Sequence, residues 1–247
     1  MCIRDSKYAV LTNTPYARAY SLFGKKYNRV GYGTMFKNWL NASSQKGYNS
    51  YGNGGAMRVS YIGWHYSTLE EVEEQAVLSS IVTHNHPEGV KAAAATAEAV
   101  FLARTGSTKK EIGQFLHKKF GYMISKPLFL YRPFGRFDDT AAGSMPLAIR
   151  CFLESEDWES CIRNVFSVKC DTDTVACIAG GIADAYYGGT GLEEEAILKR
   201  FLIKPNDRGE FDTFLYDWAT KTVEQAQKEL EEKKKREKEE KEKGGIL

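Results

Sequence analysis

The sequence has no long hydrophobic run and almost no excess of charge of one sign. Its longest nearly uncharged apolar stretch, Val175 to Tyr187, contains Asp184 and is shorter than the ~18 to 20 residues that a membrane-spanning helix needs. We therefore expect no membrane partner. The 34 basic and 32 acidic residues give a formal net charge of +2, which argues against a protein that binds nucleic acid mainly by electrostatic attraction.

Cysteine and histidine are also scarce. The five cysteines are an odd number and include no Cys-x-x-Cys pair, which suits a reducing cytoplasm better than a disulfide-bonded secreted protein. His84 and His86 are near neighbours among the four histidines, but the pair of thiols that would accompany them in a zinc site is missing. The start of the chain has no long apolar segment, so we expect no signal peptide there. We predict a cytoplasmic protein without a zinc site.

Apolar residues are plentiful, at 43% of 247 residues, so the chain can bury a substantial core. They recur at intervals of three and four and do not alternate, which indicates helices. Nothing reads as a ladder of strands, and we therefore predict an all-α fold. Helices are expected over residues 8–23, 34–41, 67–82, 87–106, from 108 onward, over 141–153, 157–167, 174–187, 193–201, and from 211 onward.

Local signals predict several helix ends. Ser67 and Glu70 have the spacing of a capping box, in which each side chain accepts a backbone N–H that would otherwise have no partner. Pro87 suits the first turn of a helix, because its missing N–H would have no partner there, and Gly106 suits the end of that helix.

The most informative stretch for chemistry is residues 170–188, where two carboxylates and a hydroxyl stand at the start of a helix of small residues. A converging pair of carboxylates favours a cation or a shifted pKa. Oxygen-only ligands suit Mg²⁺, Mn²⁺ or Ca²⁺. The alternative is an ordinary helix cap, with Asp173 bound to helix N–H groups and Asp171 in solvent.

Two further stretches are candidates for a binding site. Residues 49–58 contain three glycines and two asparagines, a composition typical of a loop with exposed N–H groups that can hold phosphate or ribose, although such loops usually only turn the chain. Residues 83–89 place His84 and other polar groups before a helix N-terminus, which favours an anion. The alternative for this stretch is a cap or a buried, hydrogen-bonded histidine.

Together and in this order, the three stretches resemble the ADP-ribosylglycohydrolase family. The family pattern is a Ser-x-Gly-Asn-Gly-x-x-Met-Arg loop, then Thr-His-x-x-Pro before an Ala-rich helix, then Asp-x-Asp-Thr at the start of a small-residue helix. The chain matches it at residues 50–58, 83–87 and 171–174. The resemblance extends from about Tyr8 to about Arg200.

The resemblance implies a compact all-α fold and an enzyme that removes ADP-ribose from a modified protein or small molecule. Nucleic acid would be a partner only as such a modified substrate. It implies a site for two Mg²⁺ ions, with Mn²⁺ as an alternative, at which Asp171, Asp173 and Thr174 are metal ligands. Met57 and Arg58 would support the glycine-rich loop. The residues that match positions lining the ADP-ribose cleft are Ser50, Tyr51, Asn53, Gly54, Gly55 and His84.

The chain departs from the family at its start. In the family an early helix carries an acidic residue and a Thr-Asp-Asp turn follows, and these supply the other metal ligands; here residues 8–11 resemble the end of the helix after that turn. We expect a truncated gene, with 1–7 a non-native leader, 8–220 the helical domain and 221–247 a charged, solvent-exposed tail. Asp138 and Asp139 are expected to precede and cap a helix and not to replace the missing ligands.

Three functions remain open at this stage. The first is a Mg²⁺-dependent hydrolase, present here as a fragment that lacks part of the metal site and whose catalytic acid would lie upstream of this chain. The second is a non-catalytic ADP-ribose or nucleotide-binding protein that keeps the cleft but lacks a full metal site. The third is a purely structural helical domain, and the match at residues 50–58 argues against it.

Overall fold

The computed structural model describes residues 3–205, 211–221, 224, 225, 228 and 232. The fold is all-α, as predicted, with one pair of two-residue strands that the sequence does not predict. Most of the predicted charged tail lies outside the described residues. Among the helices that are described, none has the length and apolar character needed to cross a bilayer. The α-helices are α1 (Ile3–Thr12), α2 (Tyr16–Lys26), α3 (Thr34–Asn41), α4 (Ser60–His65), α5 (Leu69–Ile81), α6 (Pro87–Arg104), α7 (Lys109–Phe120), α8 (Ala141–Leu153), α9 (Trp158–Phe166), α10 (Thr172–Tyr187), α11 (Glu194–Leu202) and α12 (Phe214–Thr220).

Shorter elements connect these helices. Three 3₁₀ helices are η1 (Asn53–Arg58), η2 (Leu128–Leu130) and η3 (Arg132–Phe134). The strands β1 (Lys204–Pro205) and β2 (Phe211–Asp212) pair antiparallel, so the helix expected from residue 211 begins only at Phe214.

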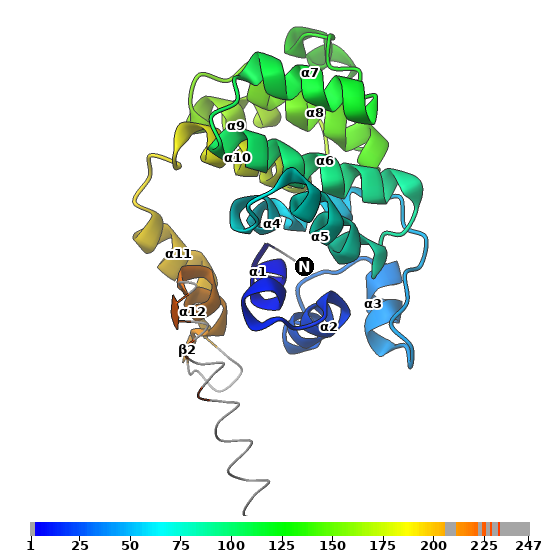
Figure 1. The fold of residues 1–247 in the computed structure, drawn as a ribbon, viewed down its shortest axis with the longest axis vertical. Helices are drawn as coiled ribbons and strands as arrows, with labels where there is room; N and C mark the ends of the chain where they lie inside the picture. Colours follow the sequence, from blue (N-terminus) through cyan, green and yellow to red (C-terminus); the bar gives the residue numbers. More distant parts are fainter. Residues whose placement is uncertain (1–2, 206–210, 222–223, 226–227, 229–231, 233–247) are drawn as a thin grey trace, which may run out of the picture.

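Helix α6 is the centre of the fold. It packs against α4, α5, α7, α8 and α10, and Figure 1 shows it between the group α7 to α10 at one end of the molecule and α1 to α3 at the other. Its alanines are buried on every side of the helix, as expected for a helix in the core of a fold. A Cβ at Gly63 of α4 would collide with the carbonyl of Ala97, so the small residues allow the two helices to cross closely.

The helix expected over residues 8–23 is wrong in its extent, because two helices occupy this region. The chain turns at Asn13, whose φ of 51° is left-handed, and Pro15 precedes the first residue of α2. Asn is one of the few residues that adopts this conformation readily, and proline cannot continue a helix. Helix α1 begins at Ile3, so residues 3–7, which the sequence assigns to a leader, are helical, and Asp5 and Ser6 are buried.

The predicted capping box of α5 is displaced by one residue. Thr68 accepts the N–H of Glu71, and the Glu71 carboxylate accepts the N–H of Thr68 at 3.1 Å. Glu70 and Glu71 are adjacent, so Ser67 and Thr68 both satisfy the spacing rule and the sequence does not distinguish them. The capping box at Thr108 and Glu111 begins α7 where the sequence predicts a helix start.

Glu98 is a buried carboxylate in the middle of α6. Its two oxygens accept hydrogen bonds from Lys119 Nζ at 2.8 and 3.0 Å, and Lys119 also forms a salt bridge with Glu73. Burial nevertheless raises the pKa of Glu98 to about 7 from its ordinary 4.5, against the opposing effect of Lys119. The folded protein therefore holds a proton on Glu98 more tightly than the unfolded chain does.

We predict that this carboxyl makes the protein less stable as the pH rises from about 4.5 to about 7. In that window the native state binds more protons than the unfolded state, so the free energy of unfolding falls with increasing pH. Glu98→Gln should flatten this part of the profile, and Glu156→Gln, at an exposed position between α8 and α9, should leave it unchanged. Denaturant unfolding at several pH values is the measurement. A wild-type profile that rises across the window would contradict the assignment.

Candidate active site

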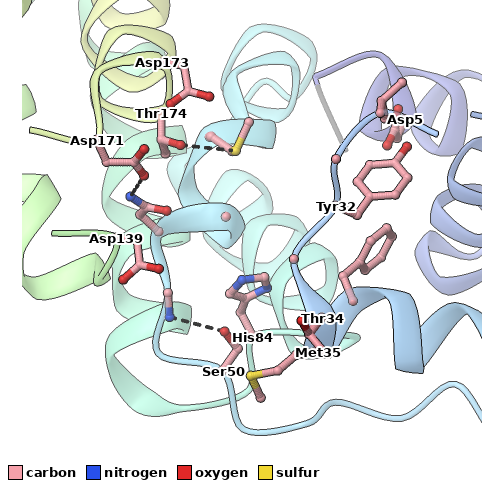
Figure 2. A pocket seen from close by; sticks show the side chains of 18 of the residues that line it. Asp5, Tyr32, Thr34, Met35, Ser50, His84, Asp139, Asp171, Asp173 and Thr174 are labelled. Carbon is pink, nitrogen blue, oxygen red and sulfur yellow. Dashed lines mark hydrogen bonds between the residues drawn. The ribbon is translucent and has the colours of Figure 1, made fainter. Parts of the chain in front are cut away.

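A cavity of about 850 Å³ lies between the N-terminal helices and the central bundle. The loop before η1, the loop after α5 and the start of α10 form one side, and Figure 2 shows Asp5 and Tyr32 across the cavity from Asp171 and Asp173. Segments more than 100 residues apart in sequence therefore share one site. Of the nine residues predicted for the site, seven line the cavity: Ser50, Asn53, Gly54, His84, Asp171, Asp173 and Thr174.

The other two predicted residues are adjacent to the cavity but do not line it. Tyr51 is exposed, and its ring meets the ring of His86 edge-on, with centroids 5.8 Å apart. Gly55 is buried, and a Cβ there would lie 2.9 Å from Ser80 Oγ. Gly55 therefore allows close packing beneath the loop.

The glycine-rich loop is fixed by hydrogen bonds to the chain before α8. Asn53 N–H donates to Asp139 O at 2.9 Å, Ala141 N–H donates to Tyr51 O at 2.9 Å, and Gly52 forms a β-bridge with Thr140. These bonds hold the loop against the segment that leads into α8.

His84 lies beneath this loop, and its ring is held by two polar neighbours. Its Nδ1 is 2.8 Å from Thr83 Oγ1 and 3.4 Å from the guanidinium of Arg58. Burial, together with the positive charge of Arg58, lowers the pKa of His84 to about 3. The imidazole is therefore neutral near pH 7.

The neighbours of His84 also determine its tautomer. Arg58 can only donate hydrogen bonds, so Nδ1 is the acceptor and Nε2 carries the proton. A Cβ on Gly54 would lie 3.0 Å from that Nε2, so only glycine gives the ring this much room beside the loop. His84 thus presents an N–H donor at the cavity wall.

The acidic part of the site stands at the start of α10. Asp171 makes no side-chain bond to the helix N–H groups. It is not free in solvent, as the cap alternative expects, because Asn53 of the glycine-rich loop binds its carboxylate. Its Oδ2 accepts Asn53 Nδ2 at 2.8 Å, and the same amide donates to Ser144 Oγ at 2.8 Å. Burial raises the pKa of Asp171, and the neighbouring Asp173 raises it further while Asn53 opposes the shift. Two neighbouring carboxylates that repel each other in this way favour a bound cation.

The donor set fits Mg²⁺ or Mn²⁺ in its chemistry but is small. Asp171, Asp173 and Thr174 supply oxygen atoms alone, which is what these ions prefer. In the part of the chain that the structure describes, no three His, Cys, Asp or Glu side chains lie close enough together to hold a metal ion.

Two further carboxylates, Asp139 and Asp5, line the cavity. Asp139 lines it, whereas Asp138 accepts the N–H and hydroxyl of Thr140 at 3.0 and 2.6 Å, as a turn residue does. Asp5 also lines it, from the segment that the sequence assigns to a leader. Asp5 lies in the first turn of α1, where acidic residues are enriched because they favour the N-terminal end of a helix.

Aromatic side chains from the N-terminal half form much of the wall opposite the acidic residues. Tyr32 and Phe36 meet edge-on, with ring centroids 5.0 Å apart, and Tyr27 and Tyr48 line the same cavity. Sequence reasoning missed this wall because the rings come from helices and loops that meet only in the folded chain. Such a wall can stack on a planar base.

Comparison with known proteins gives a consistent result. The family model described as ADP-ribosylglycohydrolase matches residues 11–233. Human ADP-ribosylhydrolase ARH3 is 32% identical over 230 residues, covering 67% of this chain and 63% of the human protein, and the mouse protein of the same name is 32% identical, with 67% and 62% covered. The chain therefore spans less than two thirds of the length of these relatives.

A solved structure shares the fold. The chain is similar to a protein described as an ADP-ribosylglycohydrolase-related protein complex, with a TM-score of 0.60 and 20% identity. The match covers 78% of this chain and 71% of that one.

Proposed function

The chain belongs to the ADP-ribosylglycohydrolase family, and on that premise we propose that it is a Mg²⁺-dependent hydrolase that removes ADP-ribose from a modified protein or small molecule. The observation that carries the proposal is the convergence of the Ser50–Gly54 loop, His84 and the Asp171–Thr174 turn on one cavity. The odd number of cysteines, with no Cys-x-x-Cys pair, favours the cytoplasm as the place where it acts.

The cavity offers different chemistry to the two ends of ADP-ribose. Backbone N–H groups of the glycine-rich loop and the Nε2–H of His84 suit the acceptor oxygens of the diphosphate and ribose. The aromatic wall at Tyr32 and Phe36 suits the adenine ring. A neutral His84 donates this hydrogen bond without adding a charge that varies near pH 7.

The acidic turn suits the sugar at which the bond is cleaved. Asn53 holds Asp171 in place, and Asp171 and Asp173 direct negative charge into the cavity, where it stabilises the oxocarbenium-like sugar of a glycosidic cleavage. Asp171, Asp173 and Thr174 would hold the divalent ion. When bound, this ion would orient the ribose hydroxyls and position the attacking water.

The second candidate is a non-catalytic protein that binds ADP-ribose or a nucleotide. The observation that favours it is the small donor set, since no third carboxylate joins Asp171 and Asp173 among the described residues. The two candidates share the binding cavity and differ in turnover.

We predict that Asn53→Ala and His84→Ala each weaken ADP-ribose binding by about tenfold or more. The first variant releases Asp171 from its amide partner, and the second removes the N–H donor beneath the loop. Calorimetric titration with ADP-ribose is the measurement. Asn41→Ala and His117→Ala are matched controls, because neither residue lines the cavity. The assignment is wrong if the two site variants bind as well as the parent chain.

Turnover distinguishes the two candidate functions. Release of free ADP-ribose from an ADP-ribosylated peptide should depend on added Mg²⁺ and stop with a chelator. Binding of ADP-ribose without any metal-dependent release would support the non-catalytic alternative.

A further inference from the structure

A surface rich in phenylalanine and basic side chains lies beside the mouth of the cavity. We call it the aromatic–basic patch and define it as residues 126–137 and 163–169. Phe134 is 78% exposed, Phe166 70%, Phe137 64% and Phe129 63%. Large apolar side chains exposed this close together on a folded domain indicate a binding surface.

The two segments of the patch contact each other. Arg132 Nε donates to Ser167 Oγ at 3.1 Å, and a Cβ at Gly135 would lie 2.8 Å from the carbonyl oxygen of Lys169. The rings and the cations therefore share one surface, although about 30 residues separate the segments in sequence.

The patch carries a local excess of positive charge that the net charge of the chain conceals. Residues 126–137 contain three basic residues and no acidic one, and residues 163–169 contain two basic residues and no acidic one. Arg163 is already paired with Glu159, which leaves Lys126, Arg132, Arg136 and Lys169 as the principal cations.

A hollow of about 150 Å³ lies at the centre of the patch. Lys126, Arg136 and Lys169 line it together with the ring of Phe134. The carboxylate of Asp138 lines it too, but Asp138 already accepts two hydrogen bonds from Thr140. Asp138 keeps its negative charge, because these bonds and the nearby Arg136 lower the pKa of its carboxyl. Three cations still outnumber this one anion, and a net positive charge in the hollow suits a phosphate group.

We propose that the aromatic–basic patch binds single-stranded nucleic acid, with phosphates against the cations and bases stacked on the exposed phenylalanines. Cationic grooves with exposed rings are the usual means of holding unpaired strands. An acidic protein segment would pair with the cations but leave the rings exposed. An apolar protein would bury the cations without partners, at a large cost.

The patch is continuous with the cavity. Phe137 belongs to the patch and also lines the cavity, so a strand bound here lies at the cavity mouth. Binding at the patch needs neither a divalent ion nor hydrolysis, so the proposal stands apart from the proposed function.

The experiment is fluorescence anisotropy with a labelled oligodeoxythymidine of about 12 nucleotides, within the usual range of such sites, and without metal or ADP-ribose. We expect saturable binding that weakens as salt increases. Phe134→Ala and Arg136→Glu should each weaken it by about tenfold or more. The matched controls are Phe201→Ala, which removes an exposed ring outside the patch, and Lys110→Glu, which reverses an exposed cation outside it. Both variants should bind the oligonucleotide as tightly as the parent chain does.

Four outcomes would overturn the proposal. The first is that the oligonucleotide does not bind, and the second is that the patch variants bind it as well as the parent chain does. The third is that polyglutamate displaces the probe as effectively as unlabelled oligonucleotide does. The fourth is that the protein binds anionic phospholipid vesicles and not the oligonucleotide. Thermal unfolding of each variant checks that the surface substitutions leave the fold intact.

Discussion

Replacing Asp171 and Asp173 together by asparagine should abolish divalent-ion binding and lower the release of ADP-ribose by more than about 100-fold, because even an outer partner of a metal ligand is typically worth 10- to 100-fold. Both carboxylates line the cavity, and burial and mutual repulsion already raise the pKa of Asp171. The amide variant keeps the shape of each side chain and removes its charge. A neutral pair no longer favours a cation.

The measurement has two readouts, calorimetric titration with Mn²⁺ and release of ADP-ribose from a modified peptide. Asp184→Asn is the matched control, because Asp184 is on the same helix about three turns away and does not line the cavity. Unchanged Mn²⁺ affinity in the double variant would show that other residues, with Asp139 and Asp5 the first to test, hold the ion.

Arg58→Ala should lower the free energy of unfolding by about 3 to 5 kcal/mol, the range found when a large buried side chain is cut back to alanine. Arg58 is among the largest fully buried side chains in the described chain. Its guanidinium stacks on the ring of Tyr20, 4.3 Å from the centroid, and donates to Thr83 Oγ1 at 2.5 Å. Removal leaves a cavity and deprives Thr83 of its donor.

Denaturant unfolding measures this loss, and Arg18→Ala, at an exposed position on α2, should change stability by less than about 0.5 kcal/mol. Arg58→Met keeps most of the volume and separates charge from packing. Because Arg58 helps to lower the pKa of His84, that pKa should rise in the Met variant, and NMR titration of the ring measures it. An unchanged His84 pKa would mean that burial alone sets it.

The sequence predicts those parts of the site that consist of short motifs. Each of three segments can be recognised as a local pattern: the loop at residues 50–58, His84 and the turn at 171–174. Their order along the chain indicates one family. Their convergence on one cavity depends on how α5, α6 and α10 pack, which no single motif specifies. The resemblance supplied this information, and residue chemistry alone left a cap or a simple turn as open alternatives.

Other features depend on packing and could not be predicted. Tyr32 and Asp5 reach the cavity only because the N-terminal helices close one side of it. The break at Asn13 could have been anticipated, because Pro15 follows it within two residues. The aromatic–basic patch was missed for a different reason, since the net charge averages over acidic residues elsewhere in the chain.

The hydrogen bonds between the glycine-rich loop and the segment before α8 have a consequence for ligand affinity. The loop is rich in glycine, the residue that loses most conformational freedom when it is ordered. Its attachment through Asn53, Tyr51 and Ala141 means that folding has already ordered it before any ligand arrives. Ligand binding therefore costs little additional loop entropy, and the amide protons of Asn53 and Ala141 should exchange slowly with solvent in the free protein as well as in the complex.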